Sequence, residues 1–369
     1  MLLVLILLVL LVLYGLMMAW FFIGWKNARG VSVVEHPDIS FSIIIAARNE
    51  QACIGSLLHA LNAQDYPSDL FEVIVVDDHS DDQTAEIVRE SAATLLQLKG
   101  DIKNSFKKKA IEAGIASAKH EWIITTDADC VPGTKWLSEI ASIIQAKDPV
   151  LIAAPVRIAG GSGLLGIFQA ADFMVLQGIT GAGVTSGKLS MCNGANLAYR
   201  RDAFNEVNGF TGIDDIASGD DMLLMYKIWQ KYPDRIAYLK ARGAIVDTLA
   251  VRTWSSFFSQ RIRWASKARH YKDKRLMPVM ILVYLLNLAI LVAVVTGIAD
   301  AYYLKVALWA MLAKVVVELP FFWIVAGFFR MRNTTPWFIL MQPLHVVYTI
   351  VSGLFGQIGK FKWKGRLVK

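Results

Sequence analysis

Pairs of acidic residues stand at several points of the chain where they could do chemistry. Asp127 and Asp129 flank one alanine and follow an apolar run at residues 123–126. In an extended chain, side chains two residues apart point to the same side, roughly 6.5 Å from each other. Carboxylates so placed repel unless a cation lies between them, and their oxygens suit Mg²⁺ or Mn²⁺, with phosphate oxygens completing the shell. We therefore predict that this pair binds Mn²⁺ or Mg²⁺; a solvated acidic turn is the alternative.

Asp77 and Asp78 follow a second apolar run, residues 71–76. An acidic residue at the end of such a strand accepts hydrogen bonds from a ribose in dinucleotide folds, so this pair is a candidate for binding a base or ribose. Turn and helix-cap roles are the alternative, and they are our preferred interpretation of Asp81 and Asp82. The sequence has no G-x-G-x-x-G loop, which argues against a nicotinamide enzyme.

Asp220 and Asp221 precede a helical pattern at residues 222–232. Acidic residues favour the first turn of a helix, so capping explains their position as well as catalysis does. The glycine-rich residues 160–163 lack phosphate-loop spacing, and we expect a flexible loop there.

A basic and aromatic segment at residues 252–275 contains the sequence QRIRW at positions 260–264. A helix at a membrane surface would bury its aromatic side chains among lipid and place its arginines on headgroups. Guanidinium groups also suit a leaving diphosphate, and Trp264 offers a flat surface to a sugar ring. The two interpretations are compatible.

Alternating strands and helices would position these groups. Short runs rich in β-branched residues at 41–47, 71–76 and 122–126 read as buried parallel strands. Helical patterns follow at 54–61, after Asp81, and at 108–118. Such alternation indicates a parallel α/β sheet with ligands beyond the carboxyl ends of its strands. All three strands end in polar or acidic clusters at that edge.

Apolar residues make up 55% of the 369, and they concentrate at both ends of the chain. The first 23 residues carry no charge and exceed the length needed to cross a bilayer, so we expect an uncleaved anchor rather than a signal peptide. Three further apolar stretches lie at 278–298, 303–329 and 337–358. The third contains Gln342, His345 and Gln357, and is either a span or a re-entrant or interfacial helix.

The net charge of +7 raises the possibility of a nucleic-acid partner. Much of the basic excess, however, lies beside apolar stretches, where an anionic lipid leaflet explains it, so we expect a membrane and no nucleic acid. Lys26 and Arg29 follow the first apolar run and predict that the central domain is cytoplasmic. Three scattered cysteines without a CxxC pair fit a reducing compartment.

Taken together, these segments resemble the membrane-integrated family 2 glycosyltransferases. The matching elements occur in family order: SIIIAARNE at 42–50, VVDDHSDDQT at 75–84, Lys107 with Ala110 and Ile111, TDAD at 126–129, GAN at 194–196, GDD at 219–221 and QRIRW at 260–264. The resemblance implies a GT-A fold, a nucleotide-sugar donor and inversion at the anomeric carbon. We expect the donor to be a UDP-sugar, and a GDP-sugar is the alternative.

The resemblance also implies residue roles. Asp221 matches the catalytic base, although the family usually has glutamate where this chain has Asp220, so either carboxylate is a candidate. Asp127 and Asp129 match the metal–diphosphate motif, and Gln260 and Trp264 match acceptor-side positions. The implied donor-binding residues are Ala47, Arg48, Glu50, Asp77, Asp78, Lys107, Asp127, Arg261 and Arg263.

We therefore expect an integral protein of a bacterial inner membrane that transfers a sugar to a lipid or glycan acceptor. Its expected parts are an anchor at 1–25, a cytoplasmic GT-A domain at 38–250, a basic interfacial segment at 251–277, a membrane region at 278–358 and a basic tail at 359–369. A processive synthase of a β-linked polysaccharide, an inactive scaffold with the same fold, and a nucleotidyltransferase are the competing interpretations. The QRIRW motif has no use in a nucleotidyltransferase.

Overall fold

The computed structural model describes residues 1–32, 38–99, 106–216, 219–267, 271, 273–358, 361–363 and 366–368. Side chains of the predicted basic tail lie outside this description, as do residues 268–270 and 272 of the predicted basic segment. The chain forms two compact units. The helical unit comprises Met1–Asn27, Gly160–Ala182 and Ala250–Leu367, and the sheet unit consists mainly of Ala28–Ala159 and Gly183–Leu249.

A seven-stranded mixed sheet forms the centre of the sheet unit. Its strand order is β3-β2-β1-β4-β8-β6-β9. The strands are β1 (Phe41–Ala47), β2 (Phe71–Asp77), β3 (Thr94–Gln97), β4 (Trp122–Asp127), β6 (Leu151–Ala153), β8 (Leu197–Arg200) and β9 (Ile236–Tyr238). The three predicted strands are confirmed, and β1 has the predicted bounds.

Strands β1 to β4 are parallel, whereas β8 runs antiparallel to β4 and to β6. The chain builds β1, β2 and β3 outward in one direction and then returns to place β4 on the other side of β1. Ligands of open α/β sheets bind at such a switch point, beyond the carboxyl ends of the strands. Registry brings Ala47 opposite Asp77 and Ala46 opposite Asp127, so both acidic strand ends share this edge.

Helices α2 (Ile54–Asn62), α3 (Thr84–Arg89), α4 (Phe106–Ser117), α5 (Trp136–Lys147), α7 (Arg201–Glu206) and α8 (Met222–Lys231) complete the sheet unit. Helix α4 packs on β1 and β2 so closely that a Cβ at Gly114 would lie 2.4 Å from Ile44 Cγ2. Strands β1 and β4 are almost wholly buried, which explains their continuous apolar sequences.

A small second sheet lies at the end of β4. It has the order β5-β10-β7 and consists of β5 (Cys130–Pro132), β7 (Val156–Ala159) and β10 (Val246–Leu249). Strand β5 begins three residues after β4 ends, so Asp127, Ala128 and Asp129 form the turn between the two sheets.

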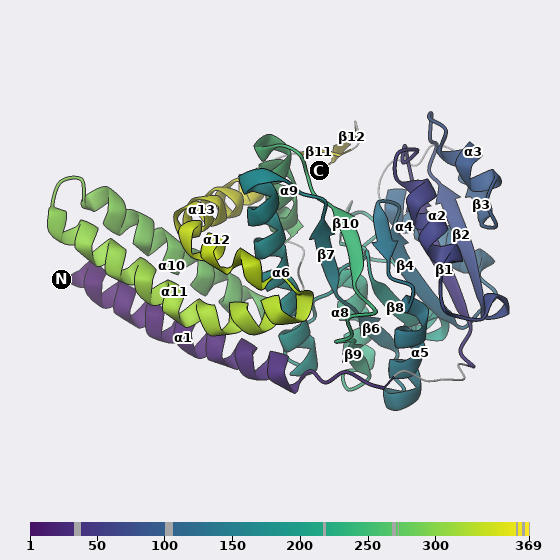
Figure 1. The fold of residues 1–369 in the computed structure, drawn as a ribbon, viewed down its shortest axis with the longest axis horizontal. Coiled ribbons are helices and arrows are strands. Elements are labelled where there is room, and N and C mark those ends of the chain that lie inside the picture. The colour runs from purple at the N-terminus through teal and green to yellow at the C-terminus, as the bar shows by residue number, and fades with distance from the viewer. Residues whose placement is uncertain are drawn as a thin grey trace. The chain divides into compact units, whose positions relative to one another are not determined.

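The helical unit contains α1 (Leu2–Asn27), α6 (Gly163–Thr185, in this unit to Ala182), α9 (Trp254–Ser266), α10 (Leu276–Thr296), α11 (Ala301–Phe329), α12 (Thr335–Leu340) and α13 (Gln342–Ile358). Helices α1, α10 and α11 lie side by side (Figure 1). Within the described residues, α1, α6, α10 and α11 are long and apolar enough to cross a membrane.

The third C-terminal apolar stretch is not one straight helix. It bends by 73° at a short break between α12 and α13, which fits a broken span or a re-entrant segment. Gln342, one of the polar residues of this stretch, faces protein partners. Gln342 is buried, accepts from Lys314 Nζ at 2.6 Å and donates to Glu318 Oε2 at 2.8 Å.

Helix α6 is the main element that sequence reasoning missed. The prediction placed one domain over residues 38–250, whereas Gly160–Ala182 belongs to the helical unit. The glycine-rich residues 160–163 are a tight entry to this helix rather than a simple flexible loop. Gly160 and Gly163 have φ of 74° and 64°, and a Cβ at Gly161 would lie 2.8 Å from Gly166 Cα.

Candidate active site

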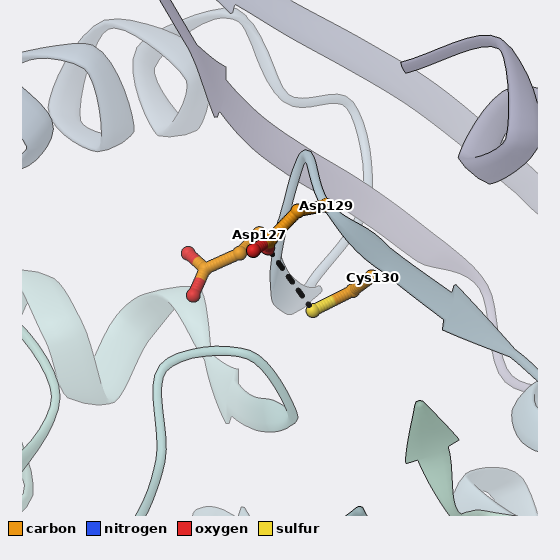
Figure 2. Close-up of side chains that lie close together, drawn as sticks. All are labelled: Asp127, Asp129 and Cys130. Carbon is orange, nitrogen blue, oxygen red and sulfur yellow. Dashed lines mark hydrogen bonds between the residues drawn. The ribbon is translucent and has the colours of Figure 1, made fainter. Parts of the chain in front are cut away.

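Asp127 and Asp129 lie on the turn that joins β4 to β5. The prediction assumed that both stand on one extended strand, but β4 ends at Asp127 and the chain reverses through the buried Ala128. Asp127, Asp129 and Cys130 each offer one ligand atom, and these atoms lie within 4.8 Å of one another (Figure 2). The turn therefore brings the carboxylates closer than an extended strand would.

The electrostatics of this turn fit a divalent cation. Burial, the neighbouring charge of Asp127 and that of Glu50 together raise the pKa of Asp129 to about 6. Carboxylates that disfavour each other's charge are stabilised by a cation between them, and oxygen ligands suit Mn²⁺ and Mg²⁺. Burial, Asp127 and Asp129 raise the pKa of the Cys130 thiol well above its ordinary value, so the thiol is protonated at neutral pH.

Lys107, at the start of α4, connects this turn to the second acidic pair. Its Nζ lies 2.6 Å from Asp127 Oδ1 and 3.0 Å from Asp220 Oδ2. Burial opposes the charge of Lys107, but Asp127 and Asp220 outweigh it and raise the pKa well above the ordinary value. An ammonium group thus joins a predicted metal ligand to a predicted catalytic carboxylate.

Asp221 precedes α8 and caps it. Its Oδ1 accepts from Met222 N at 2.7 Å, and its Oδ2 accepts from Gly194 N at 3.2 Å. A Cβ at Gly194 would lie 3.2 Å from Asp220 Oδ2 and 3.3 Å from Lys107 Nζ, so glycine permits this close approach. Asp221 therefore both caps α8 and belongs to the acidic cluster.

The loops after β1 and β2 form the other part of the strand edge. Arg48 Nη1 donates to the Asp78 carbonyl at 2.8 Å, and Asp78 N donates to Ala47 O at 2.8 Å. Both Asp77 and Asp78 are buried. His79, which adopts a left-handed backbone with φ of 56°, has Nδ1 3.0 Å from Asp78 Oδ1.

Further hydrogen bonds join the loop after β1 to the loop after β2. Asn49 N donates to Ser80 Oγ at 2.9 Å, and Glu50 N donates to Thr84 Oγ1 at 2.8 Å. Asp82 Oδ1 accepts from Thr84 N at 2.9 Å at the start of α3. This last contact agrees with the helix-start role preferred for Asp82, and it fixes the loop that presents Asp78.

Two buried polar residues support the cluster without belonging to it. Asn196 donates to the carbonyls of Pro155 and Ala244, each at 2.8 Å, and accepts from Trp136 Nε1 at 2.9 Å. Lys108 donates to the Ile213 carbonyl at 2.6 Å and so anchors the segment that leads toward Asp220. Sequence reasoning singled out Lys107 and did not assign a role to the buried Lys108.

The QRIRW motif lies on α9 in the helical unit. Thr253 caps this helix by accepting from Ser256 N at 3.1 Å. Arg261 is 4% exposed, and its Nη2 lies 2.8 Å from Asp172 Oδ2 on α6. Removing one partner of such a buried pair usually costs about 3–5 kcal/mol. Arg261 could bond directly to a donor only if its pair with Asp172 opened, which would carry a cost of this kind.

The other polar and aromatic residues of the motif are less buried than Arg261. Arg263 and Trp264 are partly buried on α9. The Trp264 ring has the Arg261 guanidinium 4.2 Å from its centroid and the Phe173 ring 5.7 Å away. Gln260 has a buried Oε1 without a hydrogen-bond partner among the described residues.

The fold thus brings one set of predicted residues together. The sheet unit contains the acidic cluster of Lys107, Asp127, Asp129, Asp220 and Asp221, together with the loops that carry Ala47, Arg48, Glu50, Asp77 and Asp78. The residues of QRIRW belong to the helical unit. Sequence reasoning missed Asp172, whose only signal is an acidic residue inside the apolar run of α6.

Comparisons with known proteins show which proteins this chain resembles. Residues 42–207 match the model of glycosyl transferase family 2. The probable glycosyltransferase YdaM of Bacillus subtilis is 28% identical over 246 residues, which cover 63% of this chain and 55% of YdaM. A poly-β-1,6-N-acetyl-D-glucosamine synthase of Staphylococcus epidermidis is 26% identical over 257 residues, which cover 67% of this chain and 59% of the synthase. The chain therefore spans little more than half the length of these relatives.

A solved structure shares the fold. The mannosyltransferase PcManGT from Pyrobaculum calidifontis, solved with GDP-Man and Mn²⁺, superposes with a TM-score of 0.57 over 95% of this chain and 99% of PcManGT, at 20% sequence identity. This likeness confirms the predicted fold class. Residues 42–207 are therefore similar to the family 2 glycosyltransferases, and the fold of the chain is that of the GT-A glycosyltransferases.

Proposed function

We propose that this protein transfers a sugar from a nucleotide-sugar donor to a membrane-associated lipid or glycan acceptor, with inversion at the anomeric carbon. The observation that carries the proposal is the cluster in which Lys107 joins Asp127 to Asp220, beside Asp129 and Asp221. Sugar transfer needs groups that stabilise a leaving diphosphate and a carboxylate that activates an attacking oxygen, and this cluster offers both.

The donor-side roles follow from charge and position. Asp127 and Asp129 would hold Mn²⁺ or Mg²⁺, and such a cation, when bound, offsets the negative charge that grows on the leaving diphosphate. The Lys107 ammonium contributes a second positive charge at the same place. The loops that present Asp77 and Asp78 bind the nucleoside, because these carboxylates lie at the sheet edge where such groups bind in α/β folds.

The acceptor-side role falls to Asp221. The acceptor oxygen attacks the anomeric carbon as the bond to the diphosphate oxygen breaks, and the hydroxyl proton passes to the carboxylate. Asp220 is paired with the Lys107 ammonium at 3.0 Å, so its carboxylate is less available to an acceptor hydroxyl than that of Asp221. Gln260, Arg263 and Trp264 of α9 serve the acceptor and the diphosphate.

Among the described residues, four candidate spans support an acceptor held at a membrane. We infer that the sheet unit is cytoplasmic, since Lys26 follows the first apolar helix and basic residues favour that side. A processive synthase is the second candidate, favoured by the similarity to a poly-β-1,6-N-acetyl-D-glucosamine synthase.

A donor screen tests the proposal. Purified protein in detergent is given a panel of nucleotide sugars and a membrane lipid extract, with Mn²⁺, with Mg²⁺ or with chelator, and nucleoside diphosphate release is followed. Release from one donor that chelator abolishes supports the proposal. Product sizing then separates one added sugar from a ladder of lengths. No release from any donor, with any acceptor fraction, would favour an inactive scaffold.

A further inference from the structure

The helical unit contains a buried cluster of charged and aromatic side chains that the proposed chemistry does not use. The side chains of Asp172 on α6 and Arg261 on α9 are 5% and 3% exposed, and their closest atoms lie 2.8 Å apart. Tyr348 on α13 donates its hydroxyl to Asp172 Oδ1 at 2.6 Å. One carboxylate thus joins three helices from separate parts of the sequence.

This carboxylate determines where the Arg261 guanidinium lies. The guanidinium carbon is 4.9 Å from the Phe257 ring centroid and 4.2 Å from the Trp264 ring centroid, so it contacts two aromatic rings of its own helix. A second residue of α6, Phe173, contacts Trp264 directly. Helix α6 therefore holds the Trp264 ring in two ways. Asp172 holds the Arg261 guanidinium that lies on the ring, and Phe173 contacts the ring directly.

Helix α13 fixes the same motif from another side. Tyr348 packs edge-on against Phe257, with ring centroids 5.6 Å apart. A Cβ at Gly356 would lie 2.7 Å from Ala265 Cβ, so the backbone of α13 closely approaches the end of α9. The residues that carry QRIRW are thus packed between α6 and α13.

We propose that Asp172 is a positioning residue, which holds Arg261 and through it sets the orientation of Trp264 toward the acceptor. The inference rests on the proposed function, because it assigns Trp264 to acceptor binding. A long arginine side chain has many rotamers, and a buried ion pair selects one of them. Asp172 therefore acts on the reaction through the Trp264 ring and not by contact with substrate.

A purely structural role is the competing explanation, and the helical unit offers a matched control. Glu318 is likewise buried and pairs with Lys314 at 2.8 Å. The hydrogen bonds and the ion pair of Glu318 join it to Tyr14 of α1, Lys314 of α11 and Gln342 of α13, and none of these residues belongs to α9. Breaking this pair disturbs the same unit without releasing Arg261.

The test compares Asp172→Asn with Glu318→Gln in the full-length protein, measuring thermal unfolding and transfer kinetics over a range of acceptor concentrations. We expect both variants to lower Tm. Asp172→Asn should raise KM for the acceptor by about tenfold to hundredfold, more than it lowers kcat, with donor KM changed less than about twofold. Glu318→Gln should leave the acceptor KM within about twofold of wild type. Asp172→Glu, which restores the charge, should recover part of the loss.

Each alternative result contradicts the inference in its own way. An unchanged acceptor KM in Asp172→Asn, or equal changes in both variants, would show that the pair is only structural. If Asp172→Asn does not fold, Arg261→Lys decides, because it keeps a positive charge for Asp172 but removes the planar guanidinium that contacts the Trp264 ring; an acceptor KM equal to wild type then overturns the role. Wild-type protein that transfers no sugar would instead mark the failure of the proposed function.

Discussion

At the scale of single residues, the two adjacent aspartates before α8 have different surroundings. Asp220 pairs with Lys107, whereas Asp221 accepts from the backbone N–H groups of Met222 and Gly194. We expect Asp221→Asn to lower kcat by at least about a thousandfold while donor affinity changes little, since the lost group acts only on the acceptor proton. Asp220→Asn should weaken donor binding instead. Transfer rates and donor titrations check both; an active Asp221→Asn beside a dead Asp220→Asn would reverse the assignment.

The carboxylates of the β4–β5 turn give a prediction about metal. Asp129→Ala should weaken Mn²⁺ binding by at least about tenfold, because it removes one of two oxygen ligands. Asp82→Ala is the matched control, since that carboxylate bonds to Thr84 and Gln51 and not to the turn. Calorimetric titration of Mn²⁺ in the absence of donor measures both. Equal affinities in wild type and Asp129→Ala would remove the turn from the metal site.

Residue types predicted that Asp127 and Asp129 lie together, but not the local geometry that brings them together. Asp127 and Asp129 do approach each other, but through a turn and not along one strand. The sequence could not identify the partner of Arg261. Asp172 lies 89 positions earlier in an apolar segment, and only tertiary packing brings the two side chains together. A buried ion pair leaves no periodic signal in the sequence.

At the scale of elements, the contact between α4 and β1 is tight enough to test. Gly114→Ala would bring a Cβ to 2.4 Å from Ile44 Cγ2, so the strand or the helix must shift, and overpacking of this kind costs about 1–3 kcal/mol. Gly55→Ala on α2 is the control, because its Cβ would lie 3.9 Å from Ile87 Cγ2 and alanine gains about 1 kcal/mol of helix propensity over glycine. Thermal unfolding should show a lower Tm for Gly114→Ala alone. A Tm equal to that of Gly55→Ala would contradict this packing.

The elements with strong local signals were predicted well. Strand β1 has the predicted bounds, and β2 and β4 each extend one residue further. Short strands such as β6 and β9 have only three residues each, too few for a periodic pattern. Helix α6 was missed because its mean apolar character is moderate and it interrupts a sequence otherwise typical of a globular domain.

At the scale of the whole molecule, the proposed topology predicts which surfaces face the cytoplasm. Lys147, exposed at the end of α5, should be cytoplasmic, whereas Ala299, exposed between α10 and α11, should lie on the opposite side. Lys147→Cys should therefore resist a membrane-impermeant maleimide in intact cells and react after lysis. Ala299→Cys should react in intact cells. Labelling of Lys147→Cys from outside would reverse the orientation.

The connection of Asp172 to Tyr348 spans 176 positions, and this has a consequence for synthesis. Helix α6 leaves the ribosome long before α9 and α13 exist, so a nascent chain carries an acidic group in an apolar helix without its final partners. Burying a charge without a partner is costly. The helical unit is therefore completed last, and until then α6 is exposed to chaperones and to the proteases that remove unfinished membrane proteins.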